Sequence, residues 1–473
     1  MLLSLFLLFI TLLIASRWHF RRRSVKRSAA IVVLGDFGRS PRMMYHTQSF
    51  AENDFETYVI AYQGSTVIPS LRKSPRVHFV YLPEPPAFIS KLSPRFFILL
   101  APFKIIFQIS VILVALLFRL DQSPSFILLQ NPPSIPTLPL VQLVSWIRNS
   151  KLIIDWHNLG YSILALKLGS HHPLVFFAKR LEMLCGRSAY AHLFVTSAMR
   201  NQLVAQWYLQ GKKIVLYDRP PSQFHRCLPS ETHNLFVQLI DSIQPSVNDI
   251  FPHYSVPTST PFTHASPHPL SSHSLREDRP ALIVSSTSWS EDEDFNILLT
   301  ALRNYEHSVR ERNDLPNALF MITGKGPLKS FYMNKILDLE STENWQHVRC
   351  RSIWLEPEHY PVLLGSADLG ICLHASSSAL DLPMKVVDMF GCSLPVLALD
   401  FKCLPELVIN GKNGLVFQTA DDLTNLLVMT LKNFPTAEKL QAMRAFFDNP
   451  NAEWDWCSWR ENWSRVLLPI VAN

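Results

Sequence analysis

Short runs of aliphatic and β-branched residues recur along the chain and alternate with segments of helical periodicity. Because each run is apolar at successive positions, the runs are typical of parallel strands whose two faces are buried under helices. Seven runs form a first set at 30–34, 57–62, 77–82, 126–129, 152–154, 193–196 and 214–216, and five form a second at 281–285, 319–323, 369–373, 395–399 and 415–417. The pattern predicts an α/β protein with two domains, residues 28–220 and 281–440, followed by a helical tail over 441–473.

The segment between the two sets, residues 221–280, has a different composition. Ten prolines lie between positions 220 and 280, and Ser, Thr and His are frequent. Because such a composition buries little apolar surface, we predict a mobile insert. Its histidines at 253, 264, 268 and 273 are spaced too irregularly to favour a metal site.

The N-terminal segment is apolar and then basic. Residues 1–16 carry no charge, and six basic residues without an acid follow between 17 and 27. Because the basic residues come after the apolar core, we predict a transmembrane anchor over 1–20, with a cleaved signal peptide as the alternative. Basic residues stay on the cytosolic side, so we expect a single-pass protein with its domains in the cytosol.

A second apolar run, residues 96–118, is long enough to cross a membrane. A span here would place strands of one predicted sheet on opposite sides of that membrane. We therefore interpret the run as membrane-associated, a helix or helix pair lying on the surface. A true span and a buried core helix remain the alternatives.

Charge and cysteine content narrow the class of protein. The formal net charge is +6 over 473 residues, and the six basic residues of 17–27 account for all of it. The folded part is therefore nearly neutral, which argues against a nucleic-acid partner. The seven cysteines are odd in number and lack paired spacing, so they indicate reduced thiols rather than a disulfide framework.

The first predicted strand runs into a glycine-bearing turn. Gly35 and Gly38 allow a ligand to approach the backbone, and the following helix offers free N–H groups to an anion. Arg39 and Arg42 add positive charge, so the turn suits a diphosphate on an acceptor. Asp36 could act as a general base or could cap the helix.

The strand at 152–154 leads directly into Asp155, Trp156, His157 and Asn158. Ligands bind at the carboxyl ends of strands in open α/β sheets, so these polar side chains are candidates for contact with substrate. His157 could bind the sugar or transfer a proton. A histidine satisfied within the core is the alternative.

Two turns of the second domain are candidates for contact with a nucleotide. The hydroxyl groups of Ser286 and Ser288 could face donor phosphates, and Gly324, Lys325 and Gly326 follow another strand. Asp292 and Asp294 formally match a metal-binding pair, but a capping box formed by Ser290 with Glu293 is the better explanation of this stretch.

A last constellation combines His374, Asp381, Lys385 and Asp388. Asp381, Lys385 and Asp388 are spaced so that they lie near one face of a helix, and if the helix begins later, Asp381 fits its cap. Asp388 would then reach the ribose and Lys385 the phosphates of a nucleotide-sugar donor. A solvated stripe of charges is the alternative.

Segments 31–43, 152–161, 285–295 and 381–392 together carry a resemblance. They resemble the two-domain GT-B glycosyltransferases, in which two Rossmann-like domains face a cleft, and among these the chitobiosyldiphosphodolichol β-mannosyltransferase family. The resemblance extends over about residues 28–465 apart from the insert. In two-domain transferases a C-terminal helical tail, here residues 441–473, often returns to pack against the first domain.

The resemblance implies an inverting transfer of mannose from GDP-mannose to dolichol-diphosphate-linked GlcNAc2, with a β-1,4 linkage. This is the first mannosylation in assembly of the lipid-linked oligosaccharide for N-glycosylation. It implies a place at the endoplasmic reticulum membrane, contact with membrane lipid, and a complex with other oligosaccharide-assembly transferases. The layout requires no cofactor, although a divalent cation could stimulate the reaction.

One departure from the wider fold family bears on stereochemistry. Many retaining GT-B enzymes carry two glutamates with seven residues between them, whereas here Asp388 takes the second place and Leu380, beside Asp381, takes the first. The broken pattern agrees with inversion, which needs one base to deprotonate the acceptor. Asp36 and His157 are the candidate bases.

Two alternatives to this function remain open. The first is another nucleotide-sugar transferase that acts on a polyprenyl-linked acceptor. The second is a non-catalytic membrane scaffold with the same fold, because fold alone does not fix function. Lys325 and Lys385, which would stabilise the leaving diphosphate, favour an enzyme.

Overall fold

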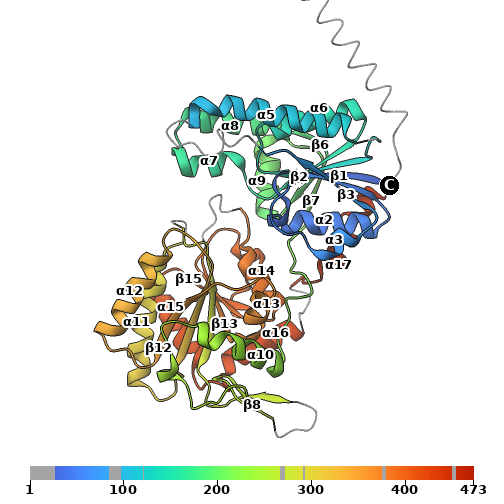
Figure 1. Ribbon diagram of the computed structural model, residues 1–473. Coiled ribbons are helices and arrows are strands. Elements are labelled where there is room, and N and C mark those ends of the chain that lie inside the picture. Colours follow the sequence, from blue (N-terminus) through green and yellow to red (C-terminus); the bar gives the residue numbers. More distant parts are fainter. Residues whose placement is uncertain are drawn as a thin grey trace, which may run out of the picture. The chain divides into compact units, whose positions relative to one another are not determined.

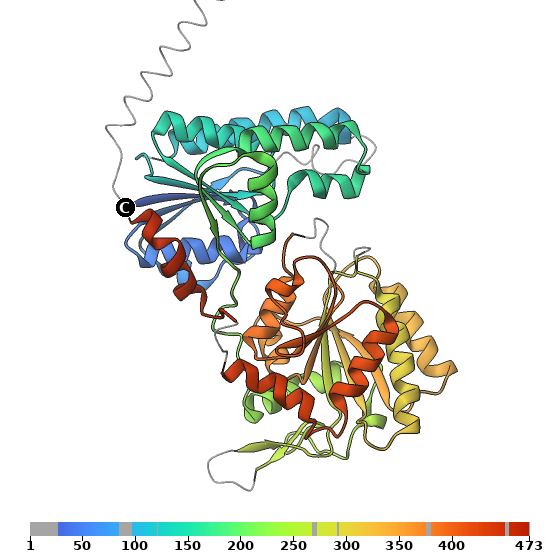
Figure 2. The same cartoon turned by 180° about the vertical axis from the view of Figure 1, so that it is seen from behind.

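The computed structural model describes residues 27–84, 97–120, 122–266, 272–290, 293–374, 380–449 and 454–472. The chain divides into two compact units. Unit 1 comprises Met1–Tyr217 and Trp459–Asn473, and unit 2 comprises Asp218–Ser458. Each unit is built around its own parallel sheet (Figures 1 and 2).

Unit 1 contains a seven-stranded sheet in the order β3-β2-β1-β4-β5-β6-β7, and all of its pairings are parallel. Its first strand in the sequence, Ser28–Asp36, is buried apart from its last two residues, as the continuous aliphatic run predicts. The strands are β1 (Ser28–Asp36), β2 (Glu56–Tyr62), β3 (Val77–Leu82), β4 (Phe126–Asn131), β5 (Lys151–Trp156), β6 (Ser188–Phe194) and β7 (Gln210–Val215).

Helices cover both faces of this sheet. One face carries α5 (Phe97–Phe118), α6 (Thr137–Arg148) and α8 (Pro173–Gly186), and the other carries α2 (Pro41–Glu52), α3 (Pro69–Lys73) and α17 (Trp459–Val466) (Figures 1 and 2). The remaining helices of unit 1 are α7 (Gly160–Leu168), α9 (Ser197–Trp207) and α18 (Leu468–Val471).

Unit 2 repeats the same topology with six parallel strands in the order β12-β11-β10-β13-β14-β15. These are β10 (Ala281–Ser286), β11 (Ala318–Thr323), β12 (Val348–Ile353), β13 (Leu369–Cys372), β14 (Val396–Leu399) and β15 (Gly414–Phe417). All twelve predicted strands overlap observed strands. The prediction missed β12, whose two arginines break the apolar run.

The faces of the second sheet have separate cores. One core includes α11 (Phe295–Glu311), α12 (Lys329–Thr342), α15 (Ala420–Leu431) and α16 (Glu438–Asp448). The other includes α10 (Pro229–Leu239), α13 (His359–Ser366) and α14 (Met384–Gly391). Both sheets therefore have the two-sided helix cover of a Rossmann-like fold, as predicted.

The C-terminal segment returns to unit 1. Trp463 of α17 is fully buried in the core of that unit, where its ring meets Phe50 at a centroid distance of 5.2 Å. Trp459 packs against Tyr45 and His46 of α2. The end of the chain thus becomes part of the core of unit 1, as the resemblance to two-domain transferases implies.

The prediction of a mobile insert over 221–280 is wrong for its described residues. They form α10, the 3-10 helices Ile240–Ser242 and Asn248–Ile250, and the antiparallel pair β8 (Thr263–Ala265) and β9 (His273–Leu275). Leu235, Phe236 and Phe262 anchor the segment in the core of unit 2. The prediction is wrong because the frequent Pro, Ser and His residues dominate the composition, whereas the few apolar residues that are buried do not.

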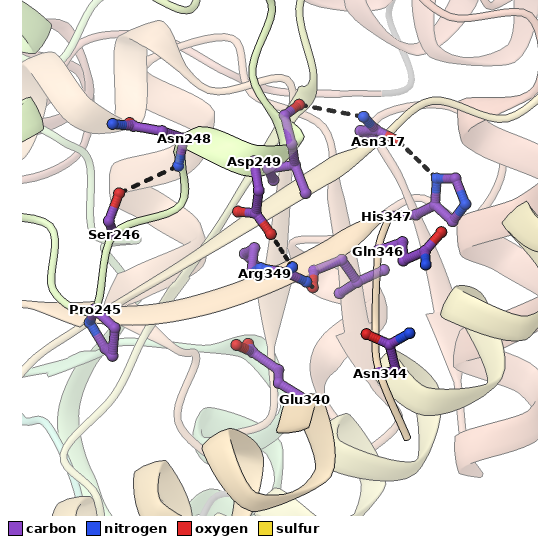
Figure 3. Close-up of polar contacts among 12 residues, drawn as sticks. Pro245, Ser246, Asn248, Asp249, Asn317, Glu340, Asn344, Gln346, His347 and Arg349 are labelled. Atoms are coloured by element: carbon purple, nitrogen blue, oxygen red, sulfur yellow. Dashed lines mark hydrogen bonds and ion pairs between the residues drawn. The ribbon is translucent and has the colours of Figure 1, made fainter. Parts of the chain in front are cut away.

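Polar contacts fix the insert to the edge strand β12. Asp249 forms an ion pair with Arg349, and Asn317 donates a hydrogen bond to the backbone carbonyl of Ile250 at 3.2 Å (Figure 3). Arg351 of the same strand donates to the carbonyl of Pro245 at 2.8 Å. The insert therefore belongs to the fold of unit 2.

The membrane predictions need correction. Among the residues that the structure describes, no helix has the length and apolar character needed to cross a membrane. The prediction of a single-pass protein of the endoplasmic reticulum membrane, with its catalytic domains in the cytosol, is therefore wrong for this part of the chain. The predicted anchor, residues 1–20, lies outside the described residues.

Helix α5 covers most of the predicted surface segment 96–118. It buries Ile112, Ala115 and Leu116 against unit 1, while Phe103 and Phe118 are 62% and 76% exposed. One face of this helix thus belongs to the core, which was an alternative left open by the sequence, and another face is apolar and exposed.

Candidate functional site

The polar residues of unit 2 gather at the point where its strand order reverses, between β10 and β13. In open α/β sheets this reversal opens a crevice at the carboxyl ends of the strands. Ser286 ends β10, and His374 follows β13, where it forms a bridge with Glu293. The predicted donor residues therefore lie at the expected edge.

The role that the sequence pattern predicts for Glu293, a member of a capping box, is wrong. The predicted capping box does not form, because Asp294 caps α11 by accepting a hydrogen bond from the Asn296 amide at 3.0 Å. Glu293 is instead buried and forms an ion pair with Lys385 of α14. It also accepts hydrogen bonds from the Thr287 hydroxyl and the Ser288 amide. A buried acid thus fixes the lysine that was predicted to meet the phosphates.

Gly324 and Gly326 allow two loops to approach closely. A Cβ atom at either glycine would lie 1.8 Å from a backbone oxygen of the neighbouring loop, that of Thr287 or Ser288, and Gly324 also has a φ of +125°. Between the glycines, the Lys325 ammonium lies 3.7 Å from the ring centre of Trp354. The glycines therefore serve loop packing and leave an exposed cation beside an exposed aromatic ring.

Asp388 of α14 lies close enough to Tyr360 that, besides burial, its charge raises the pKa of that hydroxyl, and Tyr360 belongs to a group of hydroxyls. Ser286 Oγ is 3.0 Å from the Tyr360 hydroxyl, and Thr323 donates to Ser286 at 3.2 Å. Burial, together with the negative charge of Asp218, raises the pKa of Asp388 to about 7, although the side chain keeps some contact with solvent. A carboxyl group with such a raised pKa accepts hydrogen bonds from ligand hydroxyls best once it is ionised.

The expected single helix face is wrong for Asp381. Helix α14 begins at Met384 with Pro383 at its N-cap, so Asp381 precedes the helix and does not cap it. Lys385 and Asp388 alone share the helix. The loop 375–379 lies outside the described residues.

In unit 1, the glycine turn after β1 already holds an anion of the protein. The Asp36 carboxylate caps the 3-10 helix Phe37–Arg39, accepting from the Gly38 amide at 3.0 Å and from the Ser65 amide and hydroxyl at 2.9 and 2.7 Å. Burial alone would raise the pKa of Asp36, but these hydrogen bonds and the charge of Arg39 lower it. The capping alternative therefore fits the geometry better than a general base.

The neighbouring glycines differ in importance. A Cβ atom at Gly38 would lie 2.3 Å from the carbonyl oxygen of Ser65, so packing requires glycine there, whereas Gly35 has only ordinary contacts. Arg39 is exposed and donates to the Ser65 hydroxyl at 3.2 Å. Arg42, expected near a diphosphate, is instead 5% exposed.

Asp155 forms the centre of a buried ionic cluster at the end of β5. Arg42 donates to both carboxylate oxygens, at 2.8 and 2.9 Å, and also to the Leu216 carbonyl. Burial raises the pKa of Asp155, but the charge of Arg42 and the polar contacts with His157 and His46 hold it well below its usual range. Asp155 is 0% exposed, so it is not accessible to the substrate contact that was predicted.

His157 lies at the rim of this cluster, with a side chain that is 22% exposed. Its Nε2 lies 2.9 Å from Asp155 Oδ2. Because an ionised carboxylate only accepts hydrogen bonds, Nε2 carries a proton, so Nδ1 is the nitrogen that carries the lone pair whenever the ring is neutral. Asn158 turns its oxygen to the Leu159 amide at 2.7 Å, which orders the start of α7.

A cavity of about 370 Å³ adjoins the end of β5. The backbone N–H of His157 donates a hydrogen bond to the carbonyl of Asn131, and the next two residues, Pro132 and Pro133, line the cavity. The cavity is lined mainly by apolar side chains and has the buried carboxylate of Glu182 at one side. The lining is Pro132, Pro133, Ser134, Ile135, Gly160, Tyr161, Ile163, Leu164, Ala178 and Glu182.

One cluster of potential metal ligands lies elsewhere in unit 2. His225, Cys227 and Glu231 bring ligand atoms within 4.8 Å of one another. Glu231 already accepts from the Leu228 amide at 2.7 Å and lies 3.0 Å from His225 Nε2. Burial and the charge of Glu231 raise the pKa of Cys227 to about 11, so the thiol stays protonated. The trio is explained by the start of α10 and an exposed ion pair.

Comparison with known proteins places this geometry in a family. The family model described as glycosyl transferases group 1 matches residues 280–433. A mouse chitobiosyldiphosphodolichol beta-mannosyltransferase is 42% identical over 475 residues, covering 100% of this chain and 95% of that protein. The chain belongs to the chitobiosyldiphosphodolichol beta-mannosyltransferase family.

One further relative and one solved structure are also similar to this chain. An Arabidopsis thaliana protein named UDP-glycosyltransferase TURAN is 39% identical, covering 94% of this chain and 98% of that protein. The solved structure of Anabaena Alr3699/HepE in complex with UDP-glucose matches with a TM-score of 0.60 at 13% identity, covering 94% of this chain and 99% of that one. This chain thus has the GT-B glycosyltransferase fold, with its two Rossmann-like sheets.

Proposed function

We propose that this chain is an inverting mannosyltransferase that moves mannose from GDP-mannose to dolichol-diphosphate-linked GlcNAc2 and forms a β-1,4 bond. Membership of the family supports the enzyme class and the acceptor. The Asp155–His157 pair is the observation that carries the mechanism, because Asp155 fixes a proton on Nε2 and leaves Nδ1 as the ring nitrogen that can accept a proton, at a partly exposed strand end.

In this mechanism His157 is the general base. Nδ1 takes the proton from the acceptor hydroxyl while that oxygen forms a bond to the anomeric carbon of mannose. The bond from this carbon to the diphosphate breaks, and the electron pair leaves with GDP. A single displacement of this kind converts an α-linked donor into a β-linked product.

His157 is a better base than Asp36. Asp36 accepts hydrogen bonds from Ser65 and Gly38, and its lowered pKa makes it a weak proton acceptor. His157 uses Nε2 to contact Asp155, so Nδ1 can accept a proton from the substrate.

The residues at the carboxyl edge of unit 2 fit a sugar nucleotide. Lys385 and Lys325 would neutralise the charge that develops on the leaving diphosphate, and Asp388 would accept hydrogen bonds from the ribose hydroxyls. The loops of Ser286 and Ser288, and of Gly324 and Gly326, would face the phosphates, with His374 and Asp381 beside them. With two lysines available, we expect turnover without a metal ion and at most a modest stimulation by divalent cations.

The acceptor would be held by unit 1. The apolar cavity beside His157 suits part of the lipid-linked substrate, with Asn158 and Arg39 as polar contacts for its sugars and diphosphate. The exposed face of α5, including Phe103 and Phe118, suits contact with the polyprenyl chain or with membrane lipid.

A turnover assay with the purified protein tests this proposal. Radiolabelled GDP-mannose and a GlcNAc2-diphosphate-phytanyl acceptor are incubated with the enzyme, and the lipid product is treated with β-mannosidase. We expect label in the lipid fraction that β-mannosidase releases. Label that resists β-mannosidase would contradict inversion.

A second candidate function is transfer from another nucleotide sugar, which the name of the Arabidopsis relative suggests. The same assay with UDP-glucose and UDP-GlcNAc distinguishes the two. Transfer from a UDP-sugar without transfer from GDP-mannose would reject the proposed donor, and donor binding without any transfer would favour a scaffold.

A further inference from the structure

We propose that the C-terminal helix α17 positions the base, through a relay of hydrogen bonds and close polar contacts that runs Trp463–His46–Asp155–His157. The inference rests on the proposed role of His157. It assigns to Trp463 and His46, which do not reach the substrate, the task of holding the Asp155 carboxylate in the orientation that fixes the His157 tautomer.

Trp463 determines the protonation of His46. The indole Nε1 of Trp463 lies 3.1 Å from His46 Nδ1. An indole N–H only donates, so Nδ1 of His46 must be the acceptor and the ring proton must be on Nε2. Both side chains are fully buried, and burial lowers the pKa of His46, which keeps the ring neutral.

The resulting Nε2–H group faces the catalytic pair. His46 Nε2 lies 3.2 Å from Asp155 Oδ2, although the contact is not a well-aligned hydrogen bond. The same oxygen receives Arg42 Nε at 2.8 Å and His157 Nε2 at 2.9 Å. Three N–H groups therefore surround Oδ2 of Asp155, and they limit rotation of the carboxylate group.

The tautomer matters because the opposite one would place a lone pair against an anion. If His46 carried its proton on Nδ1, its Nε2 lone pair would face Asp155 Oδ2 at about the same distance and repel it. The Trp463 N–H group prevents this state, since it would then point at another N–H. The relay thus acts by excluding a misoriented Asp155–His157 pair.

Trp459 provides a matched control on the same helix. Its indole N–H also makes a buried hydrogen bond, to Ser49 Oγ at 3.0 Å, and its ring packs edge-on against His46 and lies 5.5 Å from the Arg42 guanidinium. It donates no hydrogen bond to His46. Trp459→Phe therefore removes a comparable buried hydrogen bond, keeps an aromatic ring beside His46 and Arg42, and leaves the hydrogen bonds of the relay in place.

The first experiment compares Trp463→Phe with Trp459→Phe in the full-length enzyme. Both variants keep an aromatic ring, and both should lose a similar amount of thermal stability. Only Trp463→Phe should lower kcat, by roughly tenfold, which is what the loss of one buried hydrogen bond amounts to. KM for GDP-mannose and for the lipid acceptor should not change. Equal kcat values in both variants and in the wild type would overturn the relay.

A second pair of variants keeps the test decisive if Trp463→Phe folds poorly. His46→Gln retains one acceptor and one donor and should keep most of kcat, whereas His46→Leu removes both and should not. In the His46→Leu background, adding Trp463→Phe should lower kcat no further, because Trp463 acts only through His46. An independent loss from each change would contradict a shared path.

His157→Ala separates failure of the relay from failure of the proposed function. If His157→Ala retains turnover, the base assignment is wrong whatever Trp463 does. If His157→Ala loses turnover while Trp463→Phe and His46→Leu keep wild-type kcat, the base stands and the relay alone is rejected.

Discussion

The two units place polar residues at the same edge of the same type of sheet, yet they treat charge in opposite ways. In unit 1, Asp155 is fully buried, its charge is compensated by Arg42, and its pKa is held well below the usual range. In unit 2, burial and the charge of Asp218 raise the pKa of Asp388 to about 7. In unit 1 the charge of Asp155 is compensated by the protein itself, which suits a base held in a fixed orientation. In unit 2 Asp388 has no such compensating cation among the residues that the structure describes, so its ionised form would be stabilised by hydrogen bonds from the hydroxyls of a ligand.

The largest effect should come from removing the cation of unit 1. Arg42→Met would leave Asp155 as an uncompensated buried charge, so we expect a loss of about 3–5 kcal/mol in the free energy of unfolding and a loss of turnover. Denaturant unfolding of the full-length protein, followed by tryptophan fluorescence, measures the first quantity. A loss below about 1 kcal/mol would show that the cluster is not the internally compensated site described here.

The matched change in unit 2 should affect binding rather than folding. Lys325→Met removes an exposed cation over Trp354, an interaction worth about 0.5–1 kcal/mol at such sites. Loss of a charge-assisted contact to the diphosphate should raise KM for GDP-mannose by roughly tenfold or more. If Lys325→Met instead destabilised the protein as much as Arg42→Met while KM stayed constant, the contrast between the units would fail.

A smaller effect should appear in the pH dependence of donor binding. With a pKa of about 7, Asp388 is mostly protonated at pH 6 and mostly ionised at pH 8. Since a carboxylate accepts from both ribose hydroxyls, the affinity for GDP-mannose should increase as pH rises through about 7, by up to roughly tenfold. Isothermal titration calorimetry of the wild type and Asp388→Asn measures this. The slope should be absent in the variant, and an equal slope in both would exclude Asp388.

The same group makes a separate prediction for stability. The folded pKa of Asp388 lies above its unfolded value of about 3.9. Its contribution to the free energy of unfolding is therefore complete below pH 4 and is lost as pH rises to about 7. Asp388→Asn should gain stability relative to the wild type across this window, and a difference that does not vary with pH would contradict the raised pKa.

The fold could be predicted largely from the sequence because parallel strands buried on both faces produce continuous apolar runs. The exception, β12, is the edge strand of its sheet, so it tolerates two charged side chains. Arg351 pairs with Glu340 of α12 and Arg349 pairs with Asp249 of the insert. Neither the strand nor the order of the insert can be recognised until these partners are known.

The site could be predicted only where its residues directly follow strands. His157, Asp155 and the glycine turns were singled out in this way, although Asp155 is buried and does not have the predicted access to substrate. Trp463 and His46 were not, because 417 residues separate them in the chain and their contact depends on the return of α17 to unit 1. Glu293 was misread as a cap because nothing in the local pattern shows that Lys385 lies opposite it.

The smallest effect should come from Asp36, which the sequence alone left as an equal candidate for the base. Its carboxylate accepts from Gly38 and Ser65 and serves as a cap, so Asp36→Asn, which keeps an acceptor oxygen, should cost about 1 kcal/mol or less in stability. We expect kcat to fall by no more than a few-fold, far less than the loss of about 10²–10⁴-fold expected when a general base is removed. Parallel kcat measurements on Asp36→Asn and His157→Ala decide between the two. A loss of that larger size in Asp36→Asn, with folding intact, would transfer the role of base from the internally compensated pair at the end of β5 to the turn after β1.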